Sequence, residues 1–340
     1  MPAKTHATIT DVAQLASVSP KSVSRVLRGE GGVSKETEQR ILDAIASLHY
    51  IANPVARRLR GASNVIGLIL SGFEDYAGQI MHGISQAAQH SNYNLILYVQ
   101  HTDGQSRQSY EKFLGSGLIS GLLMIVPYDY DLLMDLCSAQ GIPYVLFDYQ
   151  GQAPDESVPT ITVTNRKGVI EAMRYLLVLG HREIGFITGD MDMASARERL
   201  RGYQDALAEA GIAFDPSLVA ESNWTQAGGL EKTRRLLERH PDLTAVVASD
   251  DLTAFGAMDA IKDSGRRVGD DISVIGFDDI PQAASVYPPL TTVRQPMIQM
   301  GETGVEMLIA MLEHRPPVSL RREFATELVI RGTTGRARSR

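Results

Sequence analysis

The N-terminal part of the chain contains the segment TITDVAQLASVSPKSVSRVLR, residues 8–28. Its first four residues match a helix-capping pattern, so a short helix is expected to follow at once. Ser19 and Pro20 then begin a second helix, because serine caps helix N-termini and proline fits the first helical position. Val23 faces inward in this second helix, whereas its basic and hydroxylated neighbours face outward. The segment therefore predicts two short helices joined by a tight turn.

A third helix is expected after the glycine-rich break at residues 29–32. Ser34 can cap it, and Ile41, Ile45 and Leu48 form one apolar stripe at helical spacing. Two short helices with a basic second helix are typical of a helix-turn-helix, which places that second helix in the DNA major groove. A small helical bundle with solvated charges is the alternative that this pattern alone leaves open.

The charge of the chain is unevenly distributed, although the total of -7 argues against nucleic-acid binding. Residues 1–63 carry nine basic and five acidic side chains, a net charge of +4. The rest carries 24 basic and 35 acidic side chains, a net charge of -11. A basic head on an acidic body indicates a nucleic-acid-binding module attached to another domain.

The composition excludes several classes of protein. A hydrophobic content of 44% with 21% charged residues is typical of a globular chain, and the length suggests two or three domains. The one cysteine, Cys137, rules out an intramolecular disulfide framework and is expected to be a small buried apolar residue. Because no signal peptide or long apolar run is present, we expect a soluble, cytoplasmic protein without membrane contact.

The segment YIANPVARRLRG, residues 50–61, predicts a short helix that starts at a proline and stops at a glycine. With this segment, residues 8–61 resemble the headpiece and hinge of the lac-repressor/galactose-repressor family of bacterial transcriptional regulators. The matching stretches are residues 11–13, 18–19, 23–26, 50–53 and 56–61. In that family the hinge helix forms on operator DNA, and a leucine at the position of Leu59 wedges into the minor groove and kinks the site.

DNA contacts are expected from both the second helix and the hinge. Arg25 suits a bidentate contact with guanine, and the serines near the helix start suit contacts with phosphates. The expected DNA-binding residues are Thr8, Ser19, Pro20, Lys21, Ser22, Ser24, Arg25, Arg28, Asn53, Ala56, Arg57, Leu59 and Arg60.

From residue 64 onward, short β-branched runs alternate with helical stretches, which favours parallel sheets with helices on both faces. Eight strands are expected, enough for two α/β lobes: residues 65–70, 95–99, 121–126, 144–147, 160–163, 184–188, 245–249 and 272–277. The chain has neither a GxGxxG nor a GxxxxGK[ST] motif, so a nucleotide-phosphate site has no support.

Ligands of open α/β sheets bind beyond the carboxyl ends of the strands. Here those ends are followed by several aspartates, an arginine-rich helix start and the one tryptophan of the chain. Carboxylates and guanidinium groups bond hydroxyls, and an aromatic face covers the C–H surface of a sugar. The pattern therefore favours a polyhydroxylated ligand.

The family resemblance extends through nearly the whole chain, in residues 179–186, 195–202, 274–279 and 288–295. It implies a two-lobed, periplasmic-binding-protein-like effector domain. It also implies a set of effector-binding residues: Ser71, Phe73, Asp148, Arg199, Trp224, Ser249 and Asp278. Many sugar-binding members have Asn-Asp where this chain has Ser249-Asp250. Because serine is shorter than asparagine, the ligand pose of those members need not carry over.

Simpler interpretations remain for some of these residues. Trp224 can be a core aromatic, the usual position of a lone tryptophan. Either Asp278 or Asp279 can cap a turn. His181 is expected to be structural, because no neighbour in the sequence completes a catalytic triad or a metal cluster.

These observations predict an α/β protein with a helix-turn-helix headpiece (residues 1–52), a hinge helix (53–63), an effector and dimerisation core (64–335) and a basic tail (336–340). The first lobe is expected to comprise about residues 64–163 and 293–325, the second about 164–292 and 326–335.

The predicted function is an allosteric transcriptional repressor that binds a pseudo-palindromic double-stranded operator as a homodimer. Its effector is expected to be a mono- or disaccharide, with no cofactor and no metal. A family member with a purine, nucleoside or other non-sugar effector is the alternative. A periplasmic-type sugar-binding protein or an enzyme has less support.

Overall fold

The computed structural model describes residues 9–27, 32–48, 64–71, 75–100, 106–127, 129–148, 157–315 and 319–338. The chain forms two compact units, Met1–Ser63 and Asn64–Arg340. We call the first unit the headpiece and the second the body.

The headpiece contains the three predicted helices, α1 (Ile9–Leu15), α2 (Pro20–Leu27) and α3 (Lys35–Ser47). Ser34 caps α3 as predicted, because its Oγ accepts a hydrogen bond from the Thr37 N–H at 3.3 Å. One small core holds the three helices together; its buried residues are Val12, Ala13, Ala16, Val23, Ile41 and Ala44. The helix-turn-helix architecture predicted from the sequence is confirmed.

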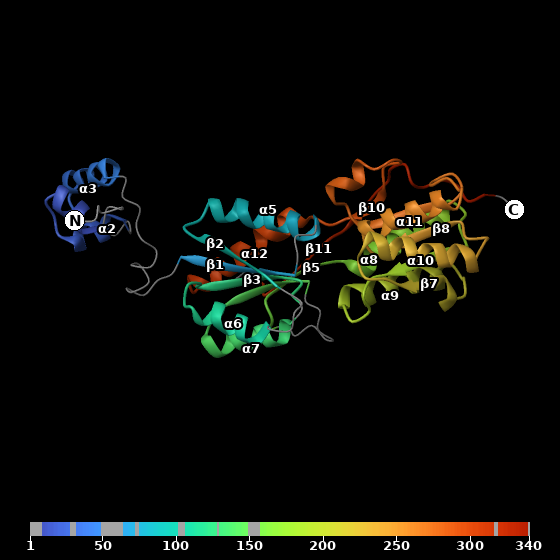
Figure 1. The fold of residues 1–340 in the computed structure, drawn as a ribbon, viewed down its shortest axis with the longest axis horizontal. Coiled ribbons are helices and arrows are strands. Elements are labelled where there is room, and N and C mark those ends of the chain that lie inside the picture. Colours follow the sequence, from blue (N-terminus) through green and yellow to red (C-terminus); the bar gives the residue numbers. More distant parts are fainter. Residues whose placement is uncertain are drawn as a thin grey trace. The chain divides into compact units, whose positions relative to one another are not determined.

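The body contains two six-stranded sheets, one in each lobe (Figure 1). The first sheet is parallel throughout, in the order β11 (Arg321–Phe324), β5 (Thr160–Val163), β4 (Tyr144–Phe147), β3 (Gly121–Ile125), β1 (Val65–Leu70) and β2 (Asn94–Val99). The second has the order β12 (Glu327–Val329), β10 (Thr291–Arg294), β9 (Ser273–Asp278), β8 (Ala245–Ala248), β6 (Ile184–Thr188) and β7 (Val219–Glu221). In this sheet only β12 runs antiparallel to its neighbour.

Helices cover both faces of each sheet in Figure 1, as predicted. In the first lobe, α5 (Asp75–Gln89) packs beside α12 (Met297–Leu312) on one face, and α6 (Ser106–Gly115) beside α7 (Tyr130–Gln140) on the other. In the second lobe, α8 (Asn165–Val178) pairs with α9 (Ala194–Glu209), and α10 (Gln226–Arg239) with α11 (Asp251–Asp263). Glycine permits one of these contacts: a Cβ at Gly83 would lie 2.0 Å from the carbonyl oxygen of Ile298.

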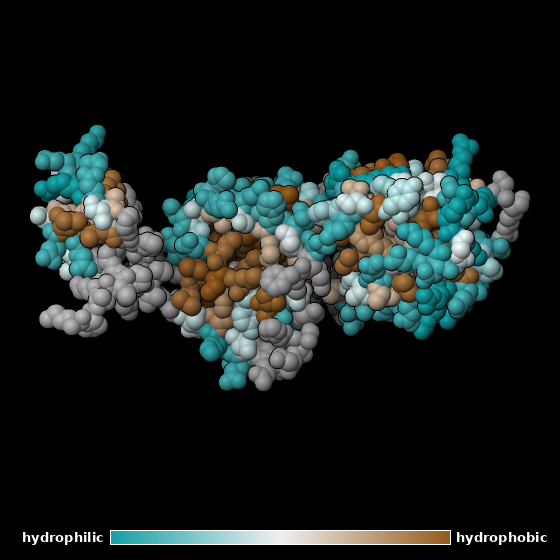
Figure 2. All heavy atoms as spheres, turned by 45° about the horizontal axis from the view of Figure 1, so that its top comes forward, coloured by the Kyte–Doolittle hydropathy of each residue, from teal (hydrophilic) through white to brown (hydrophobic). Residues whose placement is uncertain are grey.

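Because helices cover both faces of each sheet, the central strands are continuous apolar runs and do not alternate between apolar and polar residues. Strands β3, β6, β8 and β9 are buried along their whole length. The edge strand β2 is largely exposed, and its Leu95 and Leu97 are 37% and 42% exposed. Figure 2 shows apolar side chains gathered on the visible face of the first lobe, whereas hydrophilic side chains cover most of the second.

The chain crosses between the lobes three times, after β5, β10 and β11. Val293 and Arg294 pair with β9 in the second sheet, so the second crossing follows Arg294. Four strands were not predicted (β7, β10, β11 and β12), each only three or four residues long. The predicted basic tail is partly packed on the second lobe: the Ala337 N–H bonds the Leu179 carbonyl at 3.0 Å, and Arg338 pairs with Asp271.

No helix in the described part of the chain is both long enough and apolar enough to cross a membrane.

Candidate functional site

Helix α2 presents a polar face outside the headpiece core. Ser19 caps it, since its Oγ accepts a hydrogen bond from the Ser22 N–H at 3.1 Å. Lys21 is exposed and Arg25 is half-buried, while Val23 anchors the opposite face in the core with no exposed surface. A capped helix with basic and hydroxylated side chains on one face offers the donors that phosphates and base edges require.

The structure describes six of the predicted DNA-binding residues, namely Ser19, Pro20, Lys21, Ser22, Ser24 and Arg25, and all are at least partly exposed. The other predicted contacts lie outside the described residues: Thr8, Arg28, Asn53, Ala56, Arg57, Leu59 and Arg60, as does the predicted effector contact Phe73.

In the body, Arg199 on α9 is 4% exposed and firmly held. Its Nε donates to Asn165 Oδ1 at 2.8 Å, and its Nη1 donates to the Ser249 carbonyl oxygen. Nη1 also lies 3.8 Å from Asp278 Oδ1. The guanidinium carbon sits 3.7 Å from the centroid of the Phe277 ring, so the group is both stacked and bonded. These contacts fix one orientation of the guanidinium.

Asp278 ends β9 in a strained loop, with φ of 117° at Asp278 and 59° at Asp279. Asp279 holds the loop, because it pairs with Arg294 and Arg331, both at 2.6 Å. Asp278 Oδ1 accepts from Gln295 Nε2 at 2.6 Å. Burial raises the pKa of Asp278 to about 8, although the nearby guanidinium opposes this change. Of the two aspartates, Asp279 is thus the structural one.

The first lobe contributes Asp148, directly after β4 and also at positive φ (53°). The Tyr76 hydroxyl donates to Asp148 Oδ2, and Thr162 donates to Oδ1 at 3.3 Å. Burial raises the pKa of Asp148, and burial together with this carboxylate raises the pKa of Tyr76 well above its ordinary value. Tyr76 is therefore part of the same polar cluster, and the sequence analysis missed it.

Trp224 does not lie in a hydrophobic core, which was the simpler interpretation of its position. It has a φ of 61°, it is half-buried, and its ring centroid lies 5.6 Å from the Arg199 guanidinium. Its indole packs on Gly189, where a Cβ would approach the ring to 2.0 Å. Its Nε1 is buried and has no hydrogen-bond partner among the described residues.

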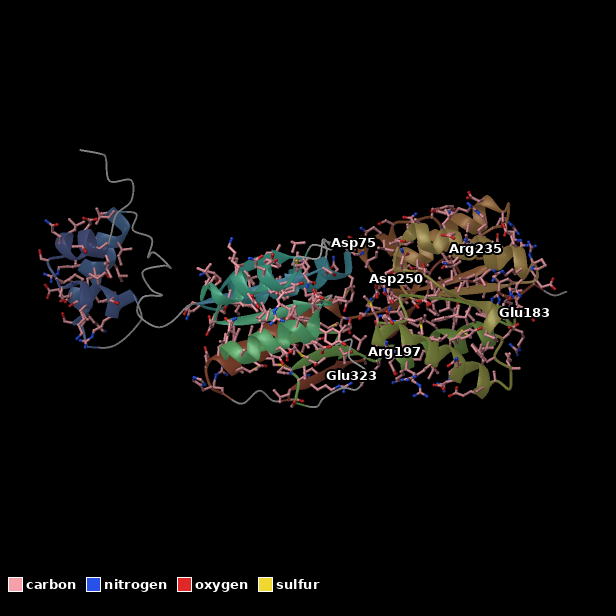
Figure 3. The ribbon with its side chains drawn as sticks, turned by 60° about the horizontal axis from the view of Figure 1, so that its bottom comes forward. Asp75, Glu183, Arg197, Arg235, Asp250 and Glu323 are labelled. Atoms are coloured by element: carbon pink, nitrogen blue, oxygen red, sulfur yellow. The ribbon has the colours of Figure 1, made fainter. Side chains whose placement is uncertain are left out.

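These groups surround a cavity of about 260 Å³ lined by residues of both lobes. Five predicted residues line it: Ser71, Asp148, Arg199, Trp224 and Asp278. Polar residues outside the predicted effector-binding set also line it: Asp75, Tyr76, Asp190, Ser195, Asn223, Thr225 and Asp250. Figure 3 shows Asp75 and Asp250 at the boundary of the two lobes, well away from Glu183 and Arg235. Ser249 is not part of the lining; it is 1% exposed and lies behind Arg199.

Two other predictions concern residues outside the cavity. Cys137 on α7 is fully buried, and burial raises its thiol pKa to about 12, as expected of an unreactive apolar residue. His181 is structural: its ring nitrogens lie 3.0 Å from Thr244 Oγ1 and from the Gly335 carbonyl oxygen. Within the described ranges, no group of three or more His, Cys, Asp or Glu is arranged to hold a metal ion.

Comparison with known proteins identifies both units. Residues 8–53 match the model of the bacterial regulatory proteins of the lacI family, and residues 173–334 match that of a periplasmic binding protein-like domain. The HTH-type transcriptional repressor PurR of Haemophilus influenzae is 33% identical over 312 residues, which cover 91% of this chain and 92% of that protein. The chain belongs to the LacI family.

Two solved structures of transcriptional regulators match nearly the whole chain. The lac repressor dimer bound to operator and the anti-inducer ONPF has a TM-score of 0.84 at 30% identity, with 97% of this chain and 99% of that one covered. The complex of the regulator CelR with cellobiose has a TM-score of 0.75 at 30% identity, with 96% and 100% covered.

The protein is therefore a DNA-binding repressor of the LacI family, a family of transcriptional regulators without enzymatic activity. Operator DNA and a small-molecule effector are the partners typical of this family, as is the dimer. The family, the two-lobed fold and the non-enzymatic function predicted from the sequence are confirmed.

Proposed function

We propose that this repressor controls genes of carbohydrate use and that a small sugar, bound in the cavity between the lobes, sets its operator affinity. The observation that carries the proposal is the lining of the cavity. Carboxylates from both lobes (Asp148 and Asp278), a fixed guanidinium (Arg199) and one indole face (Trp224) surround a space of about 260 Å³. This combination suits a ring with several hydroxyls and an apolar C–H face.

Each residue has a distinct role in this proposal. Arg199, Asp148 and Asp278 bond the hydroxyls, and Trp224 covers the C–H face. Ser71 and Phe73 make lesser contacts, and Ser249 acts through Arg199, which its carbonyl oxygen holds. Because the lining comes from both lobes, an effector that binds one lobe arrangement more tightly shifts the population toward it. The same cavity serves an inducer or a corepressor.

DNA is bound by the headpiece of each protomer in a dimer on a pseudo-palindromic operator. We assign residues 1–52 to the headpiece fold, 53–63 to a hinge helix, 64–335 to the effector core and 336–340 to the basic tail. Leu59 is the minor-groove wedge, Asn53, Ala56, Arg57 and Arg60 contact the adjacent DNA, and Thr8 and Arg28 bind phosphates. A cytoplasmic location, where operator DNA is accessible, is part of this proposal.

A purine or nucleoside effector is the second candidate, and the 33% identity to PurR favours it. Since Trp224 is the only tryptophan, its emission reports directly on the cavity. We expect a sugar to change this emission at the concentration at which it changes operator affinity. A purine that does both, with no response to sugars, would identify the second candidate as correct. A ligand that changes operator affinity while Trp224 emission stays constant would exclude Trp224 from the site.

The DNA contacts are tested by Arg25→Ala. Loss of a bidentate contact with guanine is expected to cost about 1–3 kcal/mol on the selected operator and much less on unrelated DNA. Competition binding at fixed salt measures both affinities. Equal loss on all sequences would make Arg25 a phosphate contact only. Lys21→Ala, one turn away on the same face of α2, serves as the comparison.

A further inference from the structure

The cavity is rich in carboxylates. Among the described residues that line it, one side chain is cationic, Arg199, and five are carboxylates: Asp75, Asp148, Asp190, Asp250 and Asp278. Within residues 64–163 of the first lobe, four segments lie outside the described residues: 72–74, 101–105, 128 and 149–156. None of them contains a lysine or an arginine. The lining is thus unbalanced toward negative charge.

Arg199 is held by contacts within the protein. Its Nε is bonded to Asn165, and its Nη1 donates to the Ser249 carbonyl oxygen and lies 3.8 Å from Asp278. Its face is stacked on Phe277. An effector can bond this guanidinium at its remaining edge, but the one positive charge of Arg199 is outnumbered by the carboxylates of the lining.

Several of the carboxylates have neutral hydrogen-bond donors. Gln282 Nε2 donates to Asp75 Oδ2 at 2.7 Å, and the Asp192 N–H donates to Asp190 Oδ1 at 2.9 Å. A neutral donor satisfies a hydrogen bond but leaves the negative charge in place. The high pKa of Asp278, about 8, agrees with this arrangement, since burial and the neighbouring Asp250 and Asp148 all act against its ionisation.

Helix N-termini add only partial positive charge at the cavity. Aspartates already occupy two of them: Asp75 begins α5, and Asp250 caps α11 by accepting from the Thr253 N–H at 3.1 Å. The start of α9 has no side-chain cap, but it offers roughly half a charge. It suits a hydroxyl oxygen, and it does not balance the surrounding carboxylates.

We propose that the cavity accepts neutral or cationic effectors and excludes anionic ones, so that the effector is an unphosphorylated sugar, free or within a nucleoside. This inference rests on the proposed function and specifies the ligand class of the same site. A phosphate placed among these partly buried carboxylates is repelled strongly enough to weaken binding at least about tenfold.

The test compares the binding of neutral compounds and of their phosphates to the full chain. The pairs are glucose and glucose 6-phosphate, ribose and ribose 5-phosphate, cellobiose and its phosphate, and adenosine and its 5′-monophosphate. Trp224 emission and thermal stabilisation are measured at constant ionic strength. We expect every compound that binds to do so at least tenfold more tightly than its phosphate. A phosphate that binds as tightly as its neutral partner overturns the inference and leaves the proposed function intact. No response to any pair overturns both.

A variant pair locates the effect. Asp190→Asn removes one negative charge from the lining and is expected to reduce the preference for the neutral partner several-fold. Asp192→Asn removes an exposed charge two residues away, outside the lining, and is expected to leave that preference unchanged. Equal changes in the two variants would show that the preference reflects overall charge, and would contradict a selection made in the cavity.

Discussion

The headpiece and the body bury their apolar residues on different scales. The headpiece depends on six buried residues, all between Val12 and Ala44. The body buries the central strands of two sheets, and one of its core clusters runs through both lobes, from Ile66 in β1 to Ile184 in β6 and Leu308 in α12. Because buried area relative to total surface grows with chain length, the headpiece is expected to be the less stable unit.

Charge separates the two units as well. The headpiece carries +4 and the body -11. The positive unit supplies salt-dependent attraction to DNA phosphates, while the acidic body is repelled by them. DNA affinity and effector affinity therefore reside in units with separate cores, whereas the two lobes share one core. Each prediction below tests this separation.

The largest expected effect is that of Val23→Asp in the headpiece. Val23 has no exposed surface, so a carboxylate there is expected to destabilise this unit by more than about 4 kcal/mol and to abolish operator binding. The body is expected to keep its melting temperature and its effector affinity. Circular dichroism, calorimetry and Trp224 emission measure these quantities. Leu42→Asp, at a site 45% exposed on α3, is the folded control. A lowered melting temperature of the body in Val23→Asp would show that the two units do not fold independently.

A smaller effect is expected from Arg199→Met in the body. Arg199 is buried and ion-paired, so its loss is expected to cost about 3 kcal/mol of folding stability and to abolish the effector response. The headpiece is expected to retain its DNA affinity. Arg201→Met is the matched control on α9, since Arg201 is exposed and pairs only with Glu198 in the described structure; it is expected to cost less than about 1 kcal/mol. Denaturant unfolding measures the loss of folding stability in both variants. Similar losses would mean that the burial of Arg199 does not make it more important for stability than the exposed Arg201.

The stability of the body is also expected to depend on pH. Burial raises the pKa of Asp278 from 3.8 to about 8, so its neutral form is favoured in the folded state. The stability contributed by this group is fully present below about pH 4 and is lost as the pH rises toward 8. The free energy of unfolding of Asp278→Asn relative to the natural chain is therefore expected to rise between pH 5 and 8. If the difference in free energy of unfolding between the two chains stays constant across this range, Asp278 ionises normally. The substitution is expected to leave the unfolding of the headpiece unchanged.

Most of the fold could be predicted because its elements carry strong local signals. The sequence of each headpiece helix carries a capping signal and an apolar stripe, and the eight predicted strands are mainly continuous buried runs. Three of the strands that were missed, β7, β11 and β12, are short, exposed or half-buried edge strands whose residues show no such pattern. Their pairing depends on neighbours far away in the sequence, Thr160 in the case of Arg321.

The candidate site could be predicted in part. Arg199, Asp278 and Trp224 follow strand ends or begin helices, positions that the sequence reveals. Tyr76 carried no signal of its own, because its role depends on Asp148, 72 residues away. Ser249 was expected to face a ligand, yet the side chain of Arg199 lies on its carbonyl oxygen.

The sequence by itself determined the helix-turn-helix, the alternation of strands and helices, and the separation of charge between headpiece and body. These properties follow from residue spacing and composition. The tertiary structure alone decided which carboxylates meet at the cavity, that Asp279 holds the loop while Asp278 lines the space, and that Arg199 is fixed by Asn165, Ser249 and Phe277. Such roles depend on distances between residues from separate strands and helices, and only the packing of both lobes around one core brings those residues together.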